Sequence, residues 1–199
     1  MTSPDRNIEL AAPNTDDRLI HSLALAFQND PALSWIIPDD AARRHALPRL
    51  FKTMLVADRR AGWVLASPGG EVATLWRAPG QSKTGAWEFT AQLIPMMRTF
   101  GGSLGRAIRV SDAIHAHHPK SDDFWLLQYA GVAPDHQGKG WGGLAIRDGI
   151  ARATAAGKPV LLETATLSNV SLYARLGFEI IDEWDIRGGP HFWTMLRGV

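Results

Sequence analysis

Residues 124–157 constrain the fold of this 199-residue chain more than any other stretch. Residues 124–132 are rich in aromatic and aliphatic side chains, as expected for a half-buried strand. Pro134 ends that strand, because proline has no N–H to donate to a neighbouring strand. Four glycines follow within residues 137–143, and they leave the backbone free to adopt positive φ angles. This stretch therefore predicts a strand that runs into an anion-binding loop.

An amphipathic helix is expected directly after the loop, with its unpaired N–H groups and its dipole at the loop's mouth. Its buried face is predicted from residues at helical spacing, namely Ile146, Ile150, Ala153 and Gly157. Gly157 suits a C-terminal cap, and Pro159 prevents continuation. The apolar residues 160–162 then begin a second strand, which ends at Glu163. Strand, helix and strand form a crossover unit with two parallel strands, and its ligand is expected at their carboxyl ends.

Two well-known phosphate-binding loops fit this segment poorly. A P-loop is excluded, because the spacing of the glycines is wrong and no hydroxyl residue follows Lys139. The dinucleotide fingerprint G-x-G-x-x-G does match Gly138, Gly140 and Gly143, with Glu163 about twenty residues further on. However, residues 133–137 separate its first glycine from the strand, and too little chain remains for further βα units. A dinucleotide-binding oxidoreductase therefore remains an interpretation, ranked below the two that are given at the end of this section.

The motif Val132-x-Pro134-x-x-Gln137-Gly138-Lys139-Gly140-Trp141-Gly142 resembles the acyl-CoA pyrophosphate loop of the GCN5-related N-acetyltransferases (GNAT). The second signature of that family is resembled by Leu162-Glu163-Thr164 with Asn169, Tyr173 and Leu176-Gly177-Phe178. Within the family, the motifs are most similar to those of puromycin N-acetyltransferase-like members, although the N-terminal half departs from them. The resemblance covers roughly the C-terminal half, with an acyl-CoA-binding core at about residues 124–178.

This resemblance implies an α/β (α+β) fold with the mixed sheet of the GNAT proteins, in a single domain that spans residues 1–199. It also implies acetyl-CoA as the acyl donor and no metal. The pyrophosphate is expected on the glycine-rich loop, and the pantetheine arm beside the end of the first strand. The expected cofactor-binding residues are Val132, Ala133, Gln137, Gly138, Lys139, Gly140, Trp141, Gly142, Gly143, Asn169 and Tyr173.

Acetyl transfer from a thioester to an amine needs a neutral nucleophile, a stabilised carbonyl oxygen and a proton for the departing sulfur. Tyr173 is the expected proton donor, because a phenol with a reference pKa of about 10 stays protonated at pH 7 and its family counterpart has this role. Glu163 is the candidate general base, acting directly or through water; the alternative is a structural carboxylate that pairs with Arg175. A backbone N–H near Val132 or Ala133 is the candidate donor to the carbonyl oxygen.

The N-terminal half holds the candidates for the acceptor pocket. By element order, three aromatic residues are expected where the acceptor enters, namely Phe27, Trp35 and Trp76. Residues 29–38 are predicted to be an apolar loop that either plugs the core or walls this pocket. A short strand is expected at residues 7–10, helices at 15–27, 40–60, 88–100 and 104–117, and strands at 63–66, 72–76, 178–185 and 191–196.

Three clustered histidines, His115, His117 and His118, suggest a metal site. Their spacings on a helix do not aim three imidazoles at one point, and no neighbouring carboxylate pattern completes a site. They are therefore expected to be exposed residues at a helix end.

The composition narrows the function classes. The net charge is +1, so no overall field indicates nucleic acid or a membrane surface as a partner. The chain has no cysteine, which excludes disulfides, thiolate zinc sites and a cysteine nucleophile. No leader or membrane-spanning segment is recognised, so a cytoplasmic monomer or homodimer is expected.

The predicted function is N-acetyl transfer from acetyl-CoA to a small-molecule amine, directly within a ternary complex. The alternative is a non-catalytic acyl-CoA-binding sensor or regulatory module. The presence of both Tyr173 and Glu163 favours catalysis.

Overall fold

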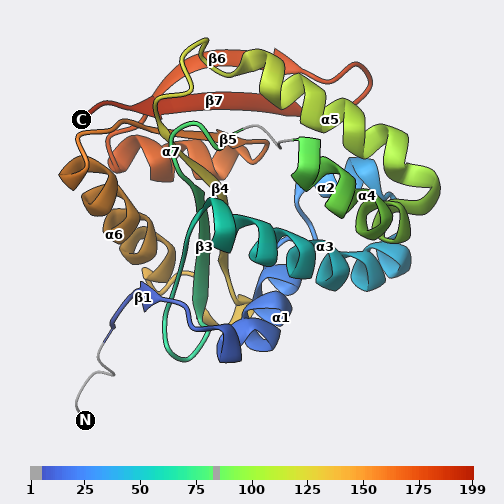
Figure 1. The fold of residues 1–199 in the computed structure, drawn as a ribbon, viewed down its shortest axis with the longest axis horizontal. Coiled ribbons are helices and arrows are strands. Elements are labelled where there is room, and N and C mark those ends of the chain that lie inside the picture. Colours follow the sequence, from blue (N-terminus) through green and yellow to red (C-terminus); the bar gives the residue numbers. More distant parts are fainter. Residues whose placement is uncertain (1–5, 83–85) are drawn as a thin grey trace.

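The computed structural model describes residues 6–82 and 86–199. Its seven-stranded sheet has the order β1-β2-β3-β4-β5-β7-β6 (Figure 1). Neighbouring strands are antiparallel except β4 and β5, which are parallel, so the predicted crossover unit and mixed α/β fold are confirmed. The strands are β1 (Glu9–Leu10), β2 (Gly62–Ala66), β3 (Val72–Arg77), β4 (Trp125–Val132), β5 (Val160–Thr164), β6 (Glu179–Asp185) and β7 (His191–Arg197).

The helices are α1 (Asp16–Ala26), α2 (Pro31–Ile36), α3 (Asp40–Ala61), α4 (Ala86–Phe100), α5 (Leu104–His117), α6 (Trp141–Ala155) and α7 (Leu167–Arg175). Short 3₁₀ helices lie at Pro13–Thr15, Gly101–Ser103 and Pro134–His136. The predicted long helices are confirmed to within a few residues. Within the described residues, no helix combines the length and the apolar character needed to cross a bilayer.

Helix α2 corrects one prediction. Residues 29–38 were expected to be a loop, but Pro31–Ile36 is helical. Asp30 is its N-cap and accepts a hydrogen bond from the Leu33 N–H at 2.9 Å, while Pro31 occupies the first helical position. An Asp-Pro pair both ends one helix and starts the next, because proline at the first position needs no N–H partner.

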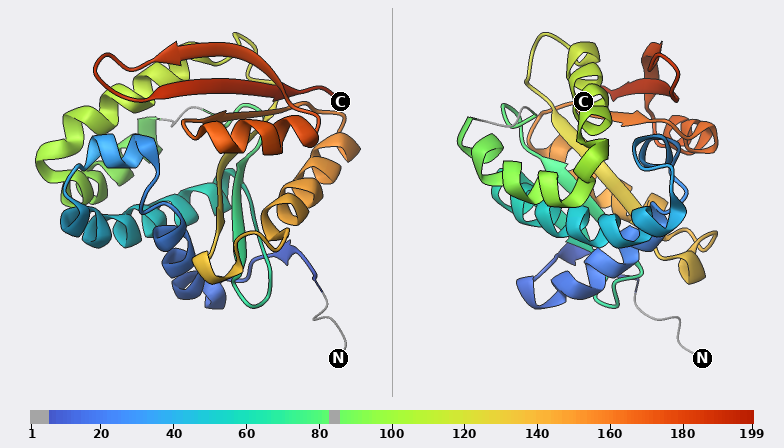
Figure 2. Two further views of the ribbon diagram at one scale, coloured as in Figure 1. Left: turned by 180° about the vertical axis from the view of Figure 1, so that it is seen from behind. Right: turned by 90° about the vertical axis from the view of Figure 1, so that its right-hand side faces the viewer.

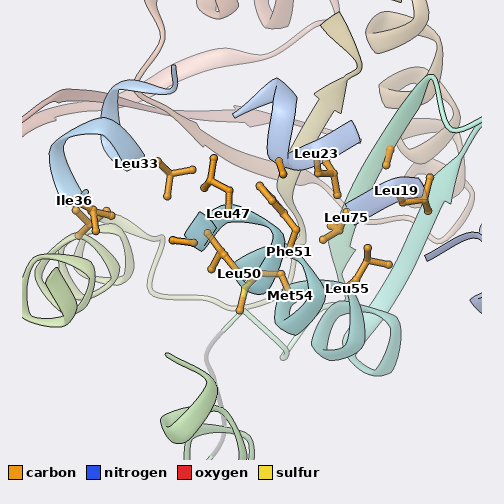
Figure 3. Packing of buried hydrophobic residues seen from close by; sticks show 14 of the residues in the cluster. Leu19, Leu23, Leu33, Ile36, Leu47, Leu50, Phe51, Met54, Leu55 and Leu75 are labelled. Carbon is orange, nitrogen blue, oxygen red and sulfur yellow. The ribbon is translucent and has the colours of Figure 1, made fainter. Parts of the chain in front are cut away.

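Helices cover both faces of the sheet. Helices α1 and α3 lie on one side of β3 and β4, and α6 lies on the other (Figure 2). In the first layer, α3 presents Leu47, Phe51 and Met54 to α1 and β3 (Figure 3). Fully burying one such side chain contributes about 1.5–3 kcal/mol, so this layer fixes the angle of α1 against the strands.

The second layer depends on contact between Trp76 and a glycine of α6. Trp76 is 0% exposed, and its indole N–H donates to Thr74 Oγ1 at 2.8 Å. A Cβ added at Gly149 would lie 2.1 Å from Trp76 Cζ2, so the helix reaches the strand only because this residue has no side chain.

Gly149→Ala is expected to lower the free energy of unfolding by about 1–3 kcal/mol, because a fully buried indole must move. Gly105→Ala is the matched control in α5, where an added Cβ would meet nothing within 4 Å. That change is expected to be neutral or stabilising by up to about 1 kcal/mol. Urea unfolding measures both, and equal stability of the two variants would contradict the packing argument.

Candidate active site

The two parallel strands separate at their carboxyl ends. Strands β4 and β5 pair only from Trp125–Leu127 opposite Val160–Leu162. The Ala133 N–H donates to the Glu71 carbonyl beside β3 at 2.9 Å. Because donors alternate along an antiparallel ladder, the N–H groups of Val132 and Ala130 point the other way, into the gap. Of the two predicted donors to a carbonyl oxygen, Val132 is therefore the one whose N–H faces the gap.

The glycine-rich loop joins β4 to α6. Gly138 and Gly140 have φ angles of 72° and 84°, which side chains other than hydrogen rarely tolerate. Gly140 is the N-cap of α6, and no side chain caps this helix, so its first N–H groups have no intrahelical acceptor. These groups and the positive end of the helix dipole make the loop a site for an anion.

Two basic side chains, Lys139 and Arg6, lie at the loop. Lys139 Nζ donates to the Asp135 carbonyl at 2.7 Å, so it folds back along the loop. The Arg6 guanidinium lies 5.6 Å from the ring centre of Trp141, the first residue of α6. Arg6 is a cation at this loop that sequence analysis missed, since only the fold brings residue 6 to residue 141.

The loop is also tied closely to the end of β4. A Cβ on Gly142 would lie 3.3 Å from Val132 Cγ2, so α6 begins in close contact with the end of β4. Gln137 Nε2 donates to the Val132 carbonyl at 3.2 Å and ties the loop to the strand end. The glycine-rich loop, the free N–H groups at the start of α6 and the unpaired edge of β4 thus lie next to one another.

A cavity of about 360 Å³ opens beside this gap. It extends from β3, β4, β5 and α7 to α2, α3, α4 and α5, with Phe27 from the end of α1, and most of its walls are apolar. Its titratable wall residues are Asp30, Arg77, His115, His118, Tyr129, Glu163 and Tyr173.

Glu163 meets a histidine, not Arg175. Its Oε1 lies 2.7 Å from His118 Nε2, and the side chains are 8% and 3% exposed. The distance is that of an ion pair, although the alignment falls short of a hydrogen bond. His118 Nδ1 has no hydrogen-bond partner in the described part of the chain. A buried carboxylate and imidazole are thus in contact in the cavity wall.

This contact corrects the expectation that the three histidines are exposed. His115 Nδ1 lies 2.7 Å from the Ser111 carbonyl, and His117 stacks on Trp184. His118 follows the end of α5 and turns inward to Glu163. The rings of His115 and His118 lie 5.4 Å apart, centre to centre, while His117 turns to Trp184. The described residues contain no group of three or more ligands placed for a metal ion.

Tyr173 lines the same cavity from α7. Its side chain is 7% exposed, and its ring packs edge-on to Phe178. Burial raises the pKa of Tyr173 to about 12, with the negative charge of Asp30 as a second cause. The hydroxyl is therefore protonated at neutral pH. Asn169, one helical turn earlier, also lines the cavity.

No family model matches the sequence. A structure of histone acetyltransferase HPA2 and related acetyltransferase from Corynebacterium glutamicum is 24% identical, with a TM-score of 0.72 over 96% of this chain and 95% of that one. A GCN5-related N-acetyltransferase structure from Rhodopseudomonas palustris is 12% identical, with a TM-score of 0.58 over 100% and 99%. The chain has the GNAT fold. Polyamine N-acetyltransferase of Drosophila melanogaster, which forms N-acetylagmatine, is 15% identical, with a TM-score of 0.60 over 97% and 99%.

Within this GNAT fold, only one of the three predicted acceptor residues lines the cavity. Phe27 does, with its ring 5.6 Å from that of Tyr129. Trp35 instead donates its indole N–H to the Gly188 carbonyl at 2.6 Å, in the turn between β6 and β7. Trp76 faces α6 on the opposite side of the sheet, as its packing on Gly149 requires. The order of helices and strands predicted which part of the chain surrounds the cavity. It did not predict the direction in which each aromatic ring points.

Proposed function

We propose that this protein is a GNAT-family N-acetyltransferase that transfers the acetyl group of acetyl-CoA to a small-molecule amine, directly within a ternary complex. The observation that carries the proposal is that the Glu163–His118 pair and Tyr173 line one cavity, beside the strand gap and the uncapped loop. The structural similarity to a polyamine N-acetyltransferase supports an amine acceptor. The motif likeness to puromycin N-acetyltransferase-like members stays a prediction.

Acetyl-CoA, when bound, supplies the acetyl group as a thioester. The N–H groups from Gly138 to Gly143 would hold its diphosphate, and the free edge of β4 would bond the amides of the pantetheine arm. The Val132 N–H is then the donor from this edge for a carbonyl oxygen that gains negative charge.

The Glu163–His118 pair is suited to take a proton from the acceptor. An ammonium cannot attack, so the amine must lose a proton before or during the reaction. A lone buried carboxylate would hold an ammonium ion as a counter-ion and oppose that loss. His118, in contact with Glu163, gives the proton a second site within the same pair. We therefore assign general-base function to the two groups as a unit.

Tyr173 is suited to donate a proton to the departing sulfur. Its hydroxyl remains protonated at neutral pH, so it can donate to the sulfur as the C–S bond breaks and negative charge develops there. Donor and acceptor of protons thus lie on different elements, α7 and β5, around one cavity.

The test is a thiol-release assay with acetyl-CoA and a panel of primary amines, alongside calorimetric titration with CoA. We expect saturable CoA binding and amine-dependent thiol release. Binding of CoA without release on any amine would instead favour the non-catalytic acyl-CoA module. No heat with CoA, together with binding of NADH, would favour the dinucleotide interpretation.

Gly140→Ala is expected to weaken CoA binding about tenfold, since a side chain at positive φ costs about 1–2 kcal/mol and displaces the donors of the loop. Gly157→Ala is the matched control, because Gly157 has a φ of 64° at the other end of α6. It carries similar backbone strain away from the loop. Calorimetry with CoA should separate the two variants; an equal loss of affinity would show that the effect is one of general stability.

A further inference from the structure

The cavity has a second carboxylate, Asp30, which the mechanism above does not use. It lies between α1 and α2, where its Oδ1 accepts a hydrogen bond from the Leu33 N–H. None of the ion pairs among the described residues includes Asp30. Burial raises the pKa of Asp30, and the N–H groups of Leu33 and Ala32 offset this only in part. A charge that has lost water without gaining a counter-ion is stabilised by any cation that enters the cavity.

The other charged wall residues have partners. Arg77 Nε lies 2.7 Å from Asp58 Oδ1, and Glu163 contacts His118. The imidazole of His115 lies within hydrogen-bond distance of the Ser111 and Ser82 carbonyls. Among the described residues, Asp30 is therefore the carboxylate of this wall that has no cationic side chain within ion-pair distance, which favours a positively charged guest.

The surroundings of Asp30 suit an organic cation rather than a metal ion. The Asp30 N–H donates to the Phe27 carbonyl, and the Phe27 ring lies 5.6 Å from that of Tyr129, so aromatic rings line the cavity near Asp30. The described residues contain no group of three or more side chains placed for a metal ion. Burial raises the pKa of Tyr173, and the negative charge of Asp30 is the second cause; for Tyr129, burial and Asp58 come before Asp30. Aromatic faces beside a carboxylate favour an ammonium group on an apolar chain.

We propose that Asp30 binds a second, non-reacting cationic group of the acceptor, so that the preferred acceptors are diamines rather than monoamines. This inference rests on the proposed acetyl transfer. The second nitrogen is assigned to Asp30 because an unpaired carboxylate keeps its partner as an ammonium ion, which does not attack. The reacting nitrogen is assigned to Glu163, whose proton His118 can share.

Asp30→Asn is the variant that tests the proposal. Asparagine is as good an N-cap as aspartate, so the bond to Leu33 can persist while the charge is lost. Kinetics are compared for a terminal diamine and for the n-alkylamine that has a methyl group in place of its second nitrogen. We expect kcat/KM for the diamine to fall about 10- to 100-fold, the range for a lost charge-assisted hydrogen bond, with monoamine values within about threefold.

Asp39→Asn is the matched control. Asp39 caps α3 in the same way, with its Oδ1 accepting from the Ala42 N–H at 2.6 Å, but it is exposed and lies outside the cavity. It is expected to leave both amines unaffected. An equal loss for both amines in Asp30→Asn, or no loss for either, would overturn the proposal.

Direct calorimetry of the diamine, without CoA, separates this inference from the proposed function. We expect the parent protein and Asp39→Asn to bind the diamine and Asp30→Asn to lose that binding about 10- to 100-fold. Equal binding by Asp30→Asn would overturn the cation site. Absence of thiol release with every amine would overturn acetyl transfer, while the difference in diamine binding still decides the role of Asp30.

Discussion

Tyr173→Phe is expected to lower kcat by about 100-fold or more, the lower end of the range for loss of a positioned acid. The affinity for CoA should stay within about threefold, because the ring that packs on Phe178 is retained. The physical reason is that the Tyr173 hydroxyl on α7 is the proposed proton source for the sulfur of coenzyme A. This hydroxyl is protonated at neutral pH in its buried site. Steady-state kinetics with saturating amine, together with calorimetry for CoA, measure the two quantities.

Tyr129→Phe is the control for that result. The chain has two tyrosines, and Tyr129 is a partly buried residue of the cavity wall, on β4. Tyr129→Phe removes a phenol hydroxyl from the same cavity, and we expect the kcat of this variant to stay within a few-fold of that of the parent protein. Similar losses in both variants would assign the effect to cavity polarity and remove Tyr173 from the role of acid.

Glu163→Gln is expected to lower kcat/KM by about 100-fold at neutral pH. The isosteric amide keeps the packing but cannot accept the proton of the acceptor. Because deprotonated amine becomes more abundant as pH rises, the deficit relative to the parent protein should narrow at high pH. A pH series of kcat/KM measures this, and a deficit that is constant with pH would point to a structural role.

His118→Gln tests whether the pair acts as a unit. If His118 and Glu163 handle one proton together, the double variant should be little worse than Glu163→Gln alone, as found for groups that act jointly. Additive losses would contradict the pair. Glu183→Gln is the control, since Glu183 lies 3.5 Å from His191 in an exposed pair outside the cavity, and it should leave kcat/KM within about threefold.

Part of the site was predictable because its signals are local. A turn without side chains is predicted from Gly138, Gly140 and Gly142, and the end of a strand from Pro134. These residues lie within a few positions of each other. Asn169 and Tyr173 share a face because they lie one helical turn apart. In each case the pattern and its consequence involve the same short segment.

The errors have a non-local cause. His118 looked like part of an exposed helix end, but Glu163 draws near it from a strand 45 positions away (163 − 118). Trp76 is predicted to line the acceptor pocket, but its side chain packs against α6 on the other face of the sheet. Which face a strand residue points to in the folded chain depends on where the distant helix α6 packs. The role of Asp30 as a cap is local, whereas its exposure to the cavity depends on how α2 packs against α3 and α5.

The sequence by itself determined the strand-loop-helix unit, the mixed α/β class and the residues of the glycine-rich loop, because backbone conformation and side-chain period are properties of neighbouring residues. Only the tertiary structure decided which side chains face the cavity and which charges have partners there. The physical reason is that burial and charge pairing depend on distances between segments far apart in the chain, which packing sets and spacing along the sequence does not.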